Sequence, residues 1–321
     1  MSPNWDRMQR IVYLSPPASV MTGGVKMLFR HVEALRESGF PACIATPDAE
    51  PPHWFETSAP MIPIDDVARH ADVLVLPESR AEFFRSFAEW DNRKLVFCQS
   101  IHFVSRGLAG VHDYADFGVE AVICPSEAAA AYCRRRFPAL KLFLVPYPLD
   151  RALFRPRAPK RLQIALMPRK RPLEASVIAD LFRAADPKFR AIPWVVLGGL
   201  SEDEMAEALG DSLVYLSLSR FDSFGLSTLE AMSCGCVVAG FTGIGGREYA
   251  TSKNGFWAPE DDCIACADQL ILAVRLATED GDRYRDFTDY ATETAAHYSR
   301  ERFRDRLTAT WRTLIGDACA A

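Results

Sequence analysis

The sequence lacks an excess of basic residues and lacks long apolar runs, and both absences restrict what the protein can do. Its formal net charge is −5, whereas domains that bind nucleic acid are usually basic. No segment approaches the roughly 18 unbroken apolar residues of a membrane-spanning helix. We therefore expect no nucleic acid among the partners and no transmembrane segment.

The sequence also lacks a recognisable signal peptide and a complete set of zinc-ribbon ligands. The polar stretch 1–10 has no apolar core of signal-peptide length. The nine cysteines are scattered, and several lie within apolar runs, as small buried side chains do in a reducing compartment. Cys263 and Cys266 form a Cys-x-x-Cys without the second ligand pair of a zinc ribbon, so we interpret them as one face of a helix start. These features predict a cytoplasmic protein.

The first half of the chain alternates short apolar strands with amphipathic helices. The clearest helix is 25–38, and Gly39 suits the position after its end. The Pro-rich stretch 47–63 predicts a loop with short structure. The expected strands are 11–14, 42–46, 73–76, 95–99, 121–124 and 142–145. Such alternation predicts a parallel sheet covered by helices.

The prolines of 145–156 interrupt this pattern and predict a stiff linker. Ser299 suits the N-cap of a last helix with one apolar face. A second alternating region lies between them, with expected strands 164–167, 194–197, 213–218 and 237–240. At 321 residues, the chain predicts an α/β fold of two doubly wound, Rossmann-like lobes with a ligand cleft between them.

The stretch 219–238 is the most informative part of the sequence. Asp222 and Glu230 lie eight positions apart, and a Phe-Gly turn between them leads into a helix start. Backbone N–H groups and the dipole at a helix N-terminus hold phosphate, and carboxylates accept hydrogen bonds from hydroxyls. The pattern therefore favours a ligand that is part sugar and part phosphate.

This stretch resembles the donor-site signature of retaining glycosyltransferases of family 4, which have the GT-B architecture. That signature is Glu-x7-Glu, with Phe-Gly after the first acid and Ala-Met-x-x-Gly after the second; here the first acid is the shorter Asp222. Further landmarks follow the family order. They are Gly23-Gly24, Val145 to Pro156, Gly245-Gly246-Arg247-Glu248, Asn254-Gly255, Pro259 and Asp261.

The resemblance implies a domain organisation and one departure from it. Residues 1–150 would form the acceptor-side lobe and 151–298 the donor lobe, and 299–321 would be a helix that packs back on the first lobe. The family usually has three strand–helix units ahead of the donor-loop strand, and only two are found here, in 164–184 and 194–209. We expect a shortened second lobe, which leaves the nucleotide base and the donor class open.

The resemblance also assigns roles on the donor side. An Arg and a Lys after the strand 164–167 would clamp the donor diphosphate; here Arg169, Lys170 and Arg171 are contiguous, and the sequence leaves open which two point inward. Alternatively, these three residues form a solvated basic loop that binds no ligand. The backbone N–H groups that would hold the diphosphate are those of Phe224, Gly225, Leu226 and Ser227.

Two acids and three residues of the first lobe complete the predicted site. Asp222 would lie by the transferred sugar or, alternatively, cap the helix; Glu230 would bind the ribose or, alternatively, be an exposed helical glutamate. Gly23 and Gly24 would contact phosphate or acceptor, or form an ordinary turn. His102 would reach the transferred sugar, or be a satisfied loop or core histidine. Glu248 is either structural or touches the donor.

The resemblance implies transfer of a sugar from a nucleotide-sugar donor to a sugar or lipid-linked acceptor, with retention of configuration and with neither metal nor cofactor. A non-catalytic GT-B module that binds a sugar nucleotide or a protein partner is the first alternative, and a sugar-nucleotide epimerase is the second. The arginines of 134–136 would either contact an anionic membrane surface weakly or form a solvated helix face.

Overall fold

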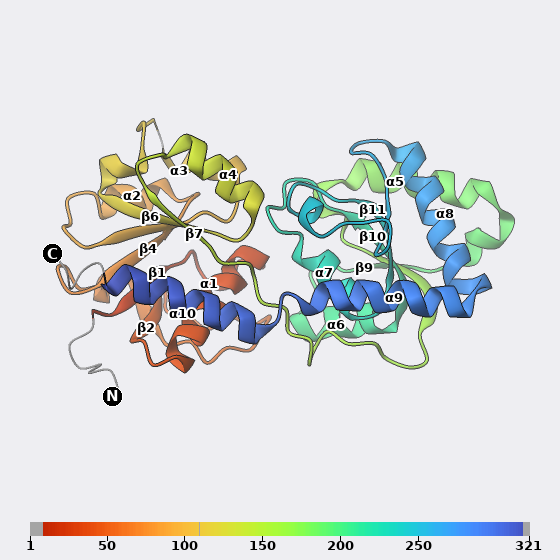
Figure 1. The fold of residues 1–321 in the computed structure, drawn as a ribbon, viewed down its shortest axis with the longest axis horizontal. Helices are drawn as coiled ribbons and strands as arrows, with labels where there is room; N and C mark the ends of the chain where they lie inside the picture. The colour runs from red at the N-terminus through yellow and green to blue at the C-terminus, as the bar shows by residue number, and fades with distance from the viewer. Residues whose placement is uncertain (1–8, 109, 317–321) are drawn as a thin grey trace. The chain divides into compact units, whose positions relative to one another are not determined.

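The computed structural model describes residues 9–108 and 110–316, which form two compact units (Figure 1). Unit 1 runs to Tyr147 and takes up the chain again at Glu301, and unit 2 is Pro148–Arg300. Most of the polar stretch 1–10 and the positions 317–321 of the predicted last helix lie outside the described residues.

Unit 1 is built on a parallel sheet in the order β3-β2-β1-β4-β5-β6-β7. The chain runs outward from β1 in one direction and from β4 in the other, so its winding reverses between these two neighbours. The strands are β1 (Ile11–Leu14), β2 (Ala42–Thr46), β3 (Met61–Pro63), β4 (Val73–Pro77), β5 (Lys94–Phe97), β6 (Val119–Cys124) and β7 (Lys141–Leu144). In doubly wound sheets such a switch point is where ligands bind.

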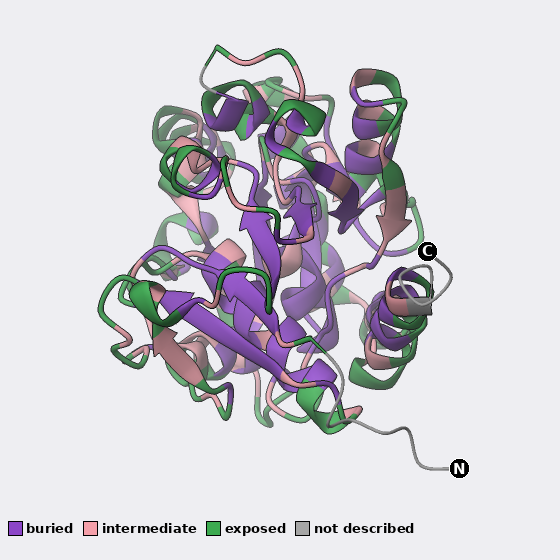
Figure 2. Cartoon of the chain, turned by 90° about the vertical axis from the view of Figure 1, so that its left-hand side faces the viewer, coloured by how far each residue is buried: buried purple, intermediate pink, exposed green. Residues whose placement is uncertain are grey.

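Helices cover both faces of this sheet, and the central strands β1, β4 and β5 are buried between them (Figure 2). The side chains of α2, α3 and α4 form one core with Val12, Leu74 and Val96. On the other face, His31 of α1 and Phe303 of α10 pack ring against ring at 5.1 Å. The helices of unit 1 are α1 (Gly23–Glu37), α2 (Ala81–Ser86), α3 (Val104–Leu108), α4 (Glu127–Arg136) and α10 (Arg300–Gly316).

Unit 2 has a shorter parallel sheet in the order β12-β11-β10-β8-β9. Its winding reverses between β8 and β10. The strands are β8 (Arg161–Leu166), β9 (Trp194–Val196), β10 (Ser212–Leu218), β11 (Val237–Phe241) and β12 (Phe256–Trp257). The helices are α5 (Pro172–Ala185), α6 (Glu202–Asp211), α7 (Leu226–Ser233), α8 (Cys263–Glu279) and α9 (Gly281–Ala296), with α5 and α8 together on one side of the sheet and α7 against α9 on the other (Figure 1).

The α/β fold is confirmed, and two strands, β8 and β9, precede β10 in unit 2 as predicted. Every expected strand is present, although β5 ends two residues before Gln99. The side chain of Gln99, beyond the end of β5, is hydrogen-bonded to Gly24 and Tyr147. The short structure predicted within the Pro-rich stretch 47–63 is β3, at its end. Within the described ranges no helix is long and apolar enough to cross a membrane.

The predicted last helix begins at Arg300, directly after Ser299, and its apolar face is buried in unit 1. Trp311 lies 6.4 Å from the ring of Tyr13, and Thr308 hydrogen-bonds to Ser38 at 2.9 Å. The predicted apolar stripe of this helix, all of it at most 5% exposed, is Phe303, Leu307, Trp311 and Leu314.

Candidate functional site

The switch point of unit 2 brings together predicted residues that are about fifty positions apart in the chain. The turn Pro168–Lys170 follows β8, and the loop 219–225 follows β10, the neighbouring strand. Because both strands run in the same direction, both segments leave the sheet at its carboxyl edge. The side chains of Lys170 and Asp222 meet there: the ammonium of Lys170 donates a hydrogen bond to Oδ1 of Asp222.

This ion pair is partly open to solvent. The side chains of Lys170 and Asp222 are 28% and 31% exposed, and Oδ2 of Asp222 accepts the backbone N–H of Arg220 at 3.4 Å. The neighbouring Arg169 is exposed and makes no ion pair within the part of the chain that the structure describes. Lys170 and Arg169 are therefore the members of the basic triplet that a ligand can reach.

Arg171 is placed differently from its two neighbours, because its side chain is only 1% exposed. Its guanidinium binds Glu260 at 2.5 Å and also Asp261, and Nε donates to the carbonyl of Ser219 at 3.0 Å. The ring of Phe241 lies 4.3 Å beneath the guanidinium. The hydrogen bond and the charge of Arg171 lower the pKa of Asp261. The structure thus uses Arg171 to join the loops after β8, β10 and β12.

The loop between the two acids depends on glycine. Gly225 has φ of +78° and is the N-cap residue of α7, so Asp222 does not cap this helix as one alternative had it. A Cβ at Gly225 would lie 2.6 Å from the hydroxyl of Tyr249, which donates to the Gly225 carbonyl at 2.9 Å. Likewise, a Cβ at Gly245 would lie 2.1 Å from the carbonyl of Ser223. The two Gly-containing loops are therefore in direct contact.

The N-terminus of α7 opens toward this loop. Leu226 and Ser227 begin the helix and are half-buried, and Phe224 is buried against Tyr298. The hydroxyl of Ser223 is buried and has no hydrogen-bond partner among the described residues. A buried hydroxyl without a partner is uncommon in proteins and indicates a place where a ligand or a water completes the hydrogen bonding.

Glu230 is only 2% exposed and lies in α7 among buried apolar neighbours. The interpretation as an exposed helical glutamate is therefore wrong. The predicted contact of Glu230 with ribose hydroxyls stays a prediction.

The switch point of unit 1 carries uncharged polar groups and one buried acid. Gly23 and Gly24 open α1 behind the N-cap Thr22, and Gln99 links the carbonyl of Gly24, at 3.1 Å, to the hydroxyl of Tyr147, at 2.7 Å. Gly23 and Gly24 thus form the first turn of a capped helix. Their contact with phosphate or acceptor stays a prediction.

Glu78 directly follows β4 and was not predicted to be part of the site. Its Oε1 accepts the N–H of Ser100 at 2.9 Å, and burial raises its pKa to about 7. His102 is two residues farther on and is exposed in the turn Ile101–Phe103, so the core-histidine interpretation is wrong. Its reach toward the transferred sugar stays a prediction. The sequence held no local signal for Glu78, because an acid directly after an apolar strand is usually a surface residue.

Three minor expectations concern side chains outside these two places. Cys263 and Cys266 lie in the first turn of α8, as predicted, with Cys266 buried. Among the predicted arginines of α4, Arg134 pairs with Glu127 at 3.9 Å and Arg136 hydrogen-bonds to the carbonyl of His112. Across residues 9–108 and 110–316, no three His, Cys, Asp or Glu side chains are grouped to hold a metal ion.

Comparison with protein families and curated sequences gives two matches in agreement with this geometry. The family model described as Glycosyl transferases group 1 matches residues 194–294, which include the loop between Asp222 and Glu230. An alpha-1,6-glucosyltransferase of Actinobacillus pleuropneumoniae is 24% identical over 264 residues, which cover 79% of this chain and 80% of that protein.

Solved structures resemble the whole chain. Sucrose-phosphate synthase from Thermosynechococcus elongatus superposes with a TM-score of 0.72 at 17% identity, over 97% of this chain and all of the other. Anabaena Alr3699/HepE, solved in complex with UDP and glucose, gives a TM-score of 0.71 at 13% identity, over 95% and 99% of the two chains. The chain therefore has the GT-B fold, and the family match supports a glycosyltransferase.

Proposed function

We propose that this protein transfers a hexose from a nucleotide-sugar donor to a hydroxyl group of an acceptor sugar, with retention of configuration. The observation that carries the proposal is the meeting of Lys170 with Asp222 at the switch point of unit 2, beside the N-terminus of α7. A cation and a helix N-terminus bind a diphosphate, and a carboxylate beside them binds the hydroxyls of a sugar.

In the proposed reaction, the bond from the anomeric carbon to the diphosphate oxygen breaks, and the bond to the acceptor oxygen forms on the same face of the ring. The acceptor proton passes to the departing diphosphate, so no side chain is assigned as the base. Lys170 and the first N–H groups of α7 would stabilise the negative charge that grows on the leaving group. The carboxylate of Asp222 would exchange its hydrogen bond from Lys170 for one from a hydroxyl of the transferred sugar. The carboxylate of Glu230 would accept hydrogen bonds from the ribose hydroxyls. In this proposal no metal ion takes part.

UDP-glucose is the first donor to test. The similar Anabaena protein was solved with UDP and glucose, and the similar curated protein is a glucosyltransferase. Lys170 approaches the site as a point charge and would serve any nucleoside diphosphate, so the base has to be identified by experiment.

A donor panel of UDP-, GDP- and ADP-hexoses, each with mono- and oligosaccharide acceptors, tests the proposal. We expect release of nucleoside diphosphate that depends on both substrates, persists in EDTA, and gives a glycoside with the donor's anomeric configuration by proton NMR. An inverted product would contradict the mechanism. Saturable donor binding without transfer would support the non-catalytic module, and conversion of the donor without acceptor would support the epimerase.

A further inference from the structure

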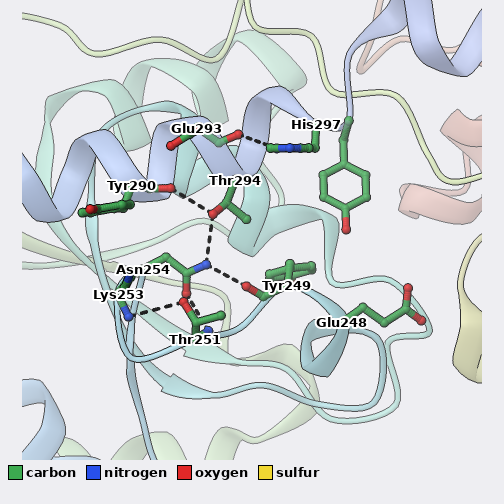
Figure 3. A pocket seen from close by; sticks show the side chains of 10 residues that line it. Glu248, Tyr249, Thr251, Lys253, Asn254, Tyr290, Glu293, Thr294 and His297 are labelled. Carbon is green, nitrogen blue, oxygen red and sulfur yellow. Dashed lines mark hydrogen bonds between the residues drawn. The ribbon is translucent and has the colours of Figure 1, made fainter.

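A separate pocket of about 380 Å³ lies in unit 2 between α9 and the turn that precedes β12 (Figure 3). Its volume is within the range of about 300–1,000 Å³ that is usual for small-molecule sites. Tyr290, Glu293 and His297 come from α9 or its end, and Lys253 and Asn254 come from the opposite turn. None of these five residues was predicted for the donor site, whereas Glu248, which was predicted either to be structural or to touch the donor, also lines the pocket.

The floor of the pocket is a hydrogen-bonded framework. The amide nitrogen of Asn254 donates to the carbonyl of Tyr249 at 2.7 Å and to the hydroxyl of Thr294 at 3.1 Å. The side-chain oxygen of Asn254 accepts the N–H of Thr251 at 2.8 Å, and Thr294 donates to the carbonyl of Tyr290. Because these groups satisfy one another, the floor fixes the shape of the pocket and does not itself need a ligand.

The polar side chains that are available to bind a ligand lie at the rim of the pocket. Nδ1 of His297 bonds the carbonyl of Glu293 at 2.9 Å; a carbonyl only accepts, so Nδ1 carries a proton and Nε2 of the neutral ring can accept. Within the described ranges, the carboxylate of Glu293 and the hydroxyl of Tyr290 have no hydrogen-bond partner. Lys253 lies over the ring of Tyr290, 5.3 Å from its centre.

We propose that this pocket is a carbohydrate-binding subsite, which takes one pyranose ring of the acceptor. The pocket offers carboxylate and imidazole acceptors for hydroxyl groups, an ammonium donor, and tyrosine rings against which the apolar face of a sugar packs. Glu293 and Lys253 have opposite charges, so the rim suits a neutral, polyhydroxylated ligand better than an anion. The choice of a sugar rests on the proposed function.

The pocket and the donor loop share one wall. Tyr249 binds Asn254 through its backbone and Gly225 through its hydroxyl. Tyr298, which also lines the pocket, packs edge-on against Phe224 with 5.1 Å between ring centres. A sugar held here would therefore lie one layer of side chains from the donor loop without entering it.

Amide NMR of the full chain, titrated with methyl glycosides of glucose, galactose and mannose and with maltotriose, tests this proposal. We expect saturable shifts at Thr251, Asn254 and Thr294 with at least one of these sugars, and we expect them to persist when UDP is bound. The variant Glu293→Gln should weaken that sugar about tenfold, as loss of a hydrogen bond to a charged group predicts. The exposed Asp289→Asn, which removes a charge from the same helix outside the pocket, should change it by less than about twofold.

The two proposals fail separately in this experiment. Normal UDP binding with no sugar-dependent shift at the pocket, or with shifts confined to residues 222–230, overturns the subsite and leaves the proposed function standing. Sugar binding that is equal in Glu293→Gln, Tyr290→Phe and wild type also overturns it, as does binding of inorganic phosphate instead of sugars. Absence of any nucleotide binding would instead contradict the proposed function.

Discussion

The two switch points of the molecule differ in charge. In unit 2 the point between β8 and β10 carries the Lys170–Asp222 pair, with the buried Arg171 behind it. In unit 1 the point between β1 and β4 carries the Gly24–Gln99–Tyr147 chain of neutral hydrogen bonds, and its acid, Glu78, is buried with its pKa raised to about 7. The same doubly wound geometry thus presents partly exposed opposite charges in one unit and neutral polar groups in the other.

This difference matches the two halves of the proposed reaction. A leaving diphosphate gains negative charge and needs nearby cations, whereas an acceptor hydroxyl is neutral and needs only to be positioned. In the proposed reaction, the charged switch point would hold the donor and the neutral one the acceptor. The following variants test whether charge is what separates them.

Lys170→Ala should have the largest effect. We expect the rate constant for donor turnover to fall about 100- to 1,000-fold, as when one preorganised group that stabilises transition-state charge is removed. Arg169→Ala is the matched control on the exposed neighbour and should cost distinctly less. Release of nucleoside diphosphate under saturating substrates measures both. If a variant that combines Arg169→Ala with Lys170→Ala retained normal turnover, the assignment of the diphosphate clamp would be wrong.

Arg171→Ala should chiefly lower stability. Removal of the buried guanidinium deletes its contacts with Glu260, Asp261, the Ser219 carbonyl and the Phe241 ring, and loss of such a buried group typically costs about 1–3 kcal/mol. Thermal unfolding should show the loss in unit 2, with Arg169→Ala nearly unchanged. A fully stable Arg171→Ala with impaired donor binding would show instead that Arg171 contacts the ligand.

Glu78→Gln should alter the pH dependence of stability. Because burial raises the pKa of Glu78 to about 7, the unfolded chain ionises first, and wild-type stability should fall as the pH rises from about 4.5 to about 7. The full difference corresponds to about 3 kcal/mol. The glutamine keeps an acceptor for Ser100 and cannot ionise, so its advantage over wild type should grow across that range and be absent below it. Parallel pH profiles of the two proteins would count against a raised pKa.

Tyr147→Phe should have the smallest effect. It removes one hydroxyl-to-Gln99 hydrogen bond, worth about 1 kcal/mol, and leaves the charge of unit 1 unchanged. If the neutral chain positions the acceptor, its Michaelis constant should rise while donor binding stays the same. A changed donor affinity would contradict the idea that the unit 1 switch point serves only the acceptor.

The strands could be predicted because each is a run of apolar residues between polar breaks, and the donor loop because Asp222, Gly225 and Glu230 stand at informative spacings. The different roles of Lys170 and Arg171 could not be predicted. They are adjacent in sequence, and what separates them is contact with Glu260 and Asp261, some ninety positions away. The burial of Glu230 likewise depends on the elements that pack around α7, which are distant in sequence.

In unit 1, the neutral chain escaped prediction for the same reason. Gln99 was assigned to a strand because it continues an apolar run, but its amide is held by partners from α1 and from the linker segment. Glu78 stands next to an apolar strand as many surface acids do, and only the packing of Tyr114 and Ser100 around it makes it buried. Long-range contacts decide both cases, and a local pattern does not contain them.

The return of α10 to unit 1 has a consequence for how the molecule is made. Unit 2 is one uninterrupted segment of the chain. Its two ends lie next to each other, where the N–H of Leu149 donates a hydrogen bond to the carbonyl of Tyr298 at 2.8 Å. It can fold on the ribosome as soon as it has emerged. Unit 1 begins earlier but finishes later, because Trp311 must arrive before the face of its sheet around Tyr13 is covered. The half of the protein that is synthesised first is thus the half that is completed last.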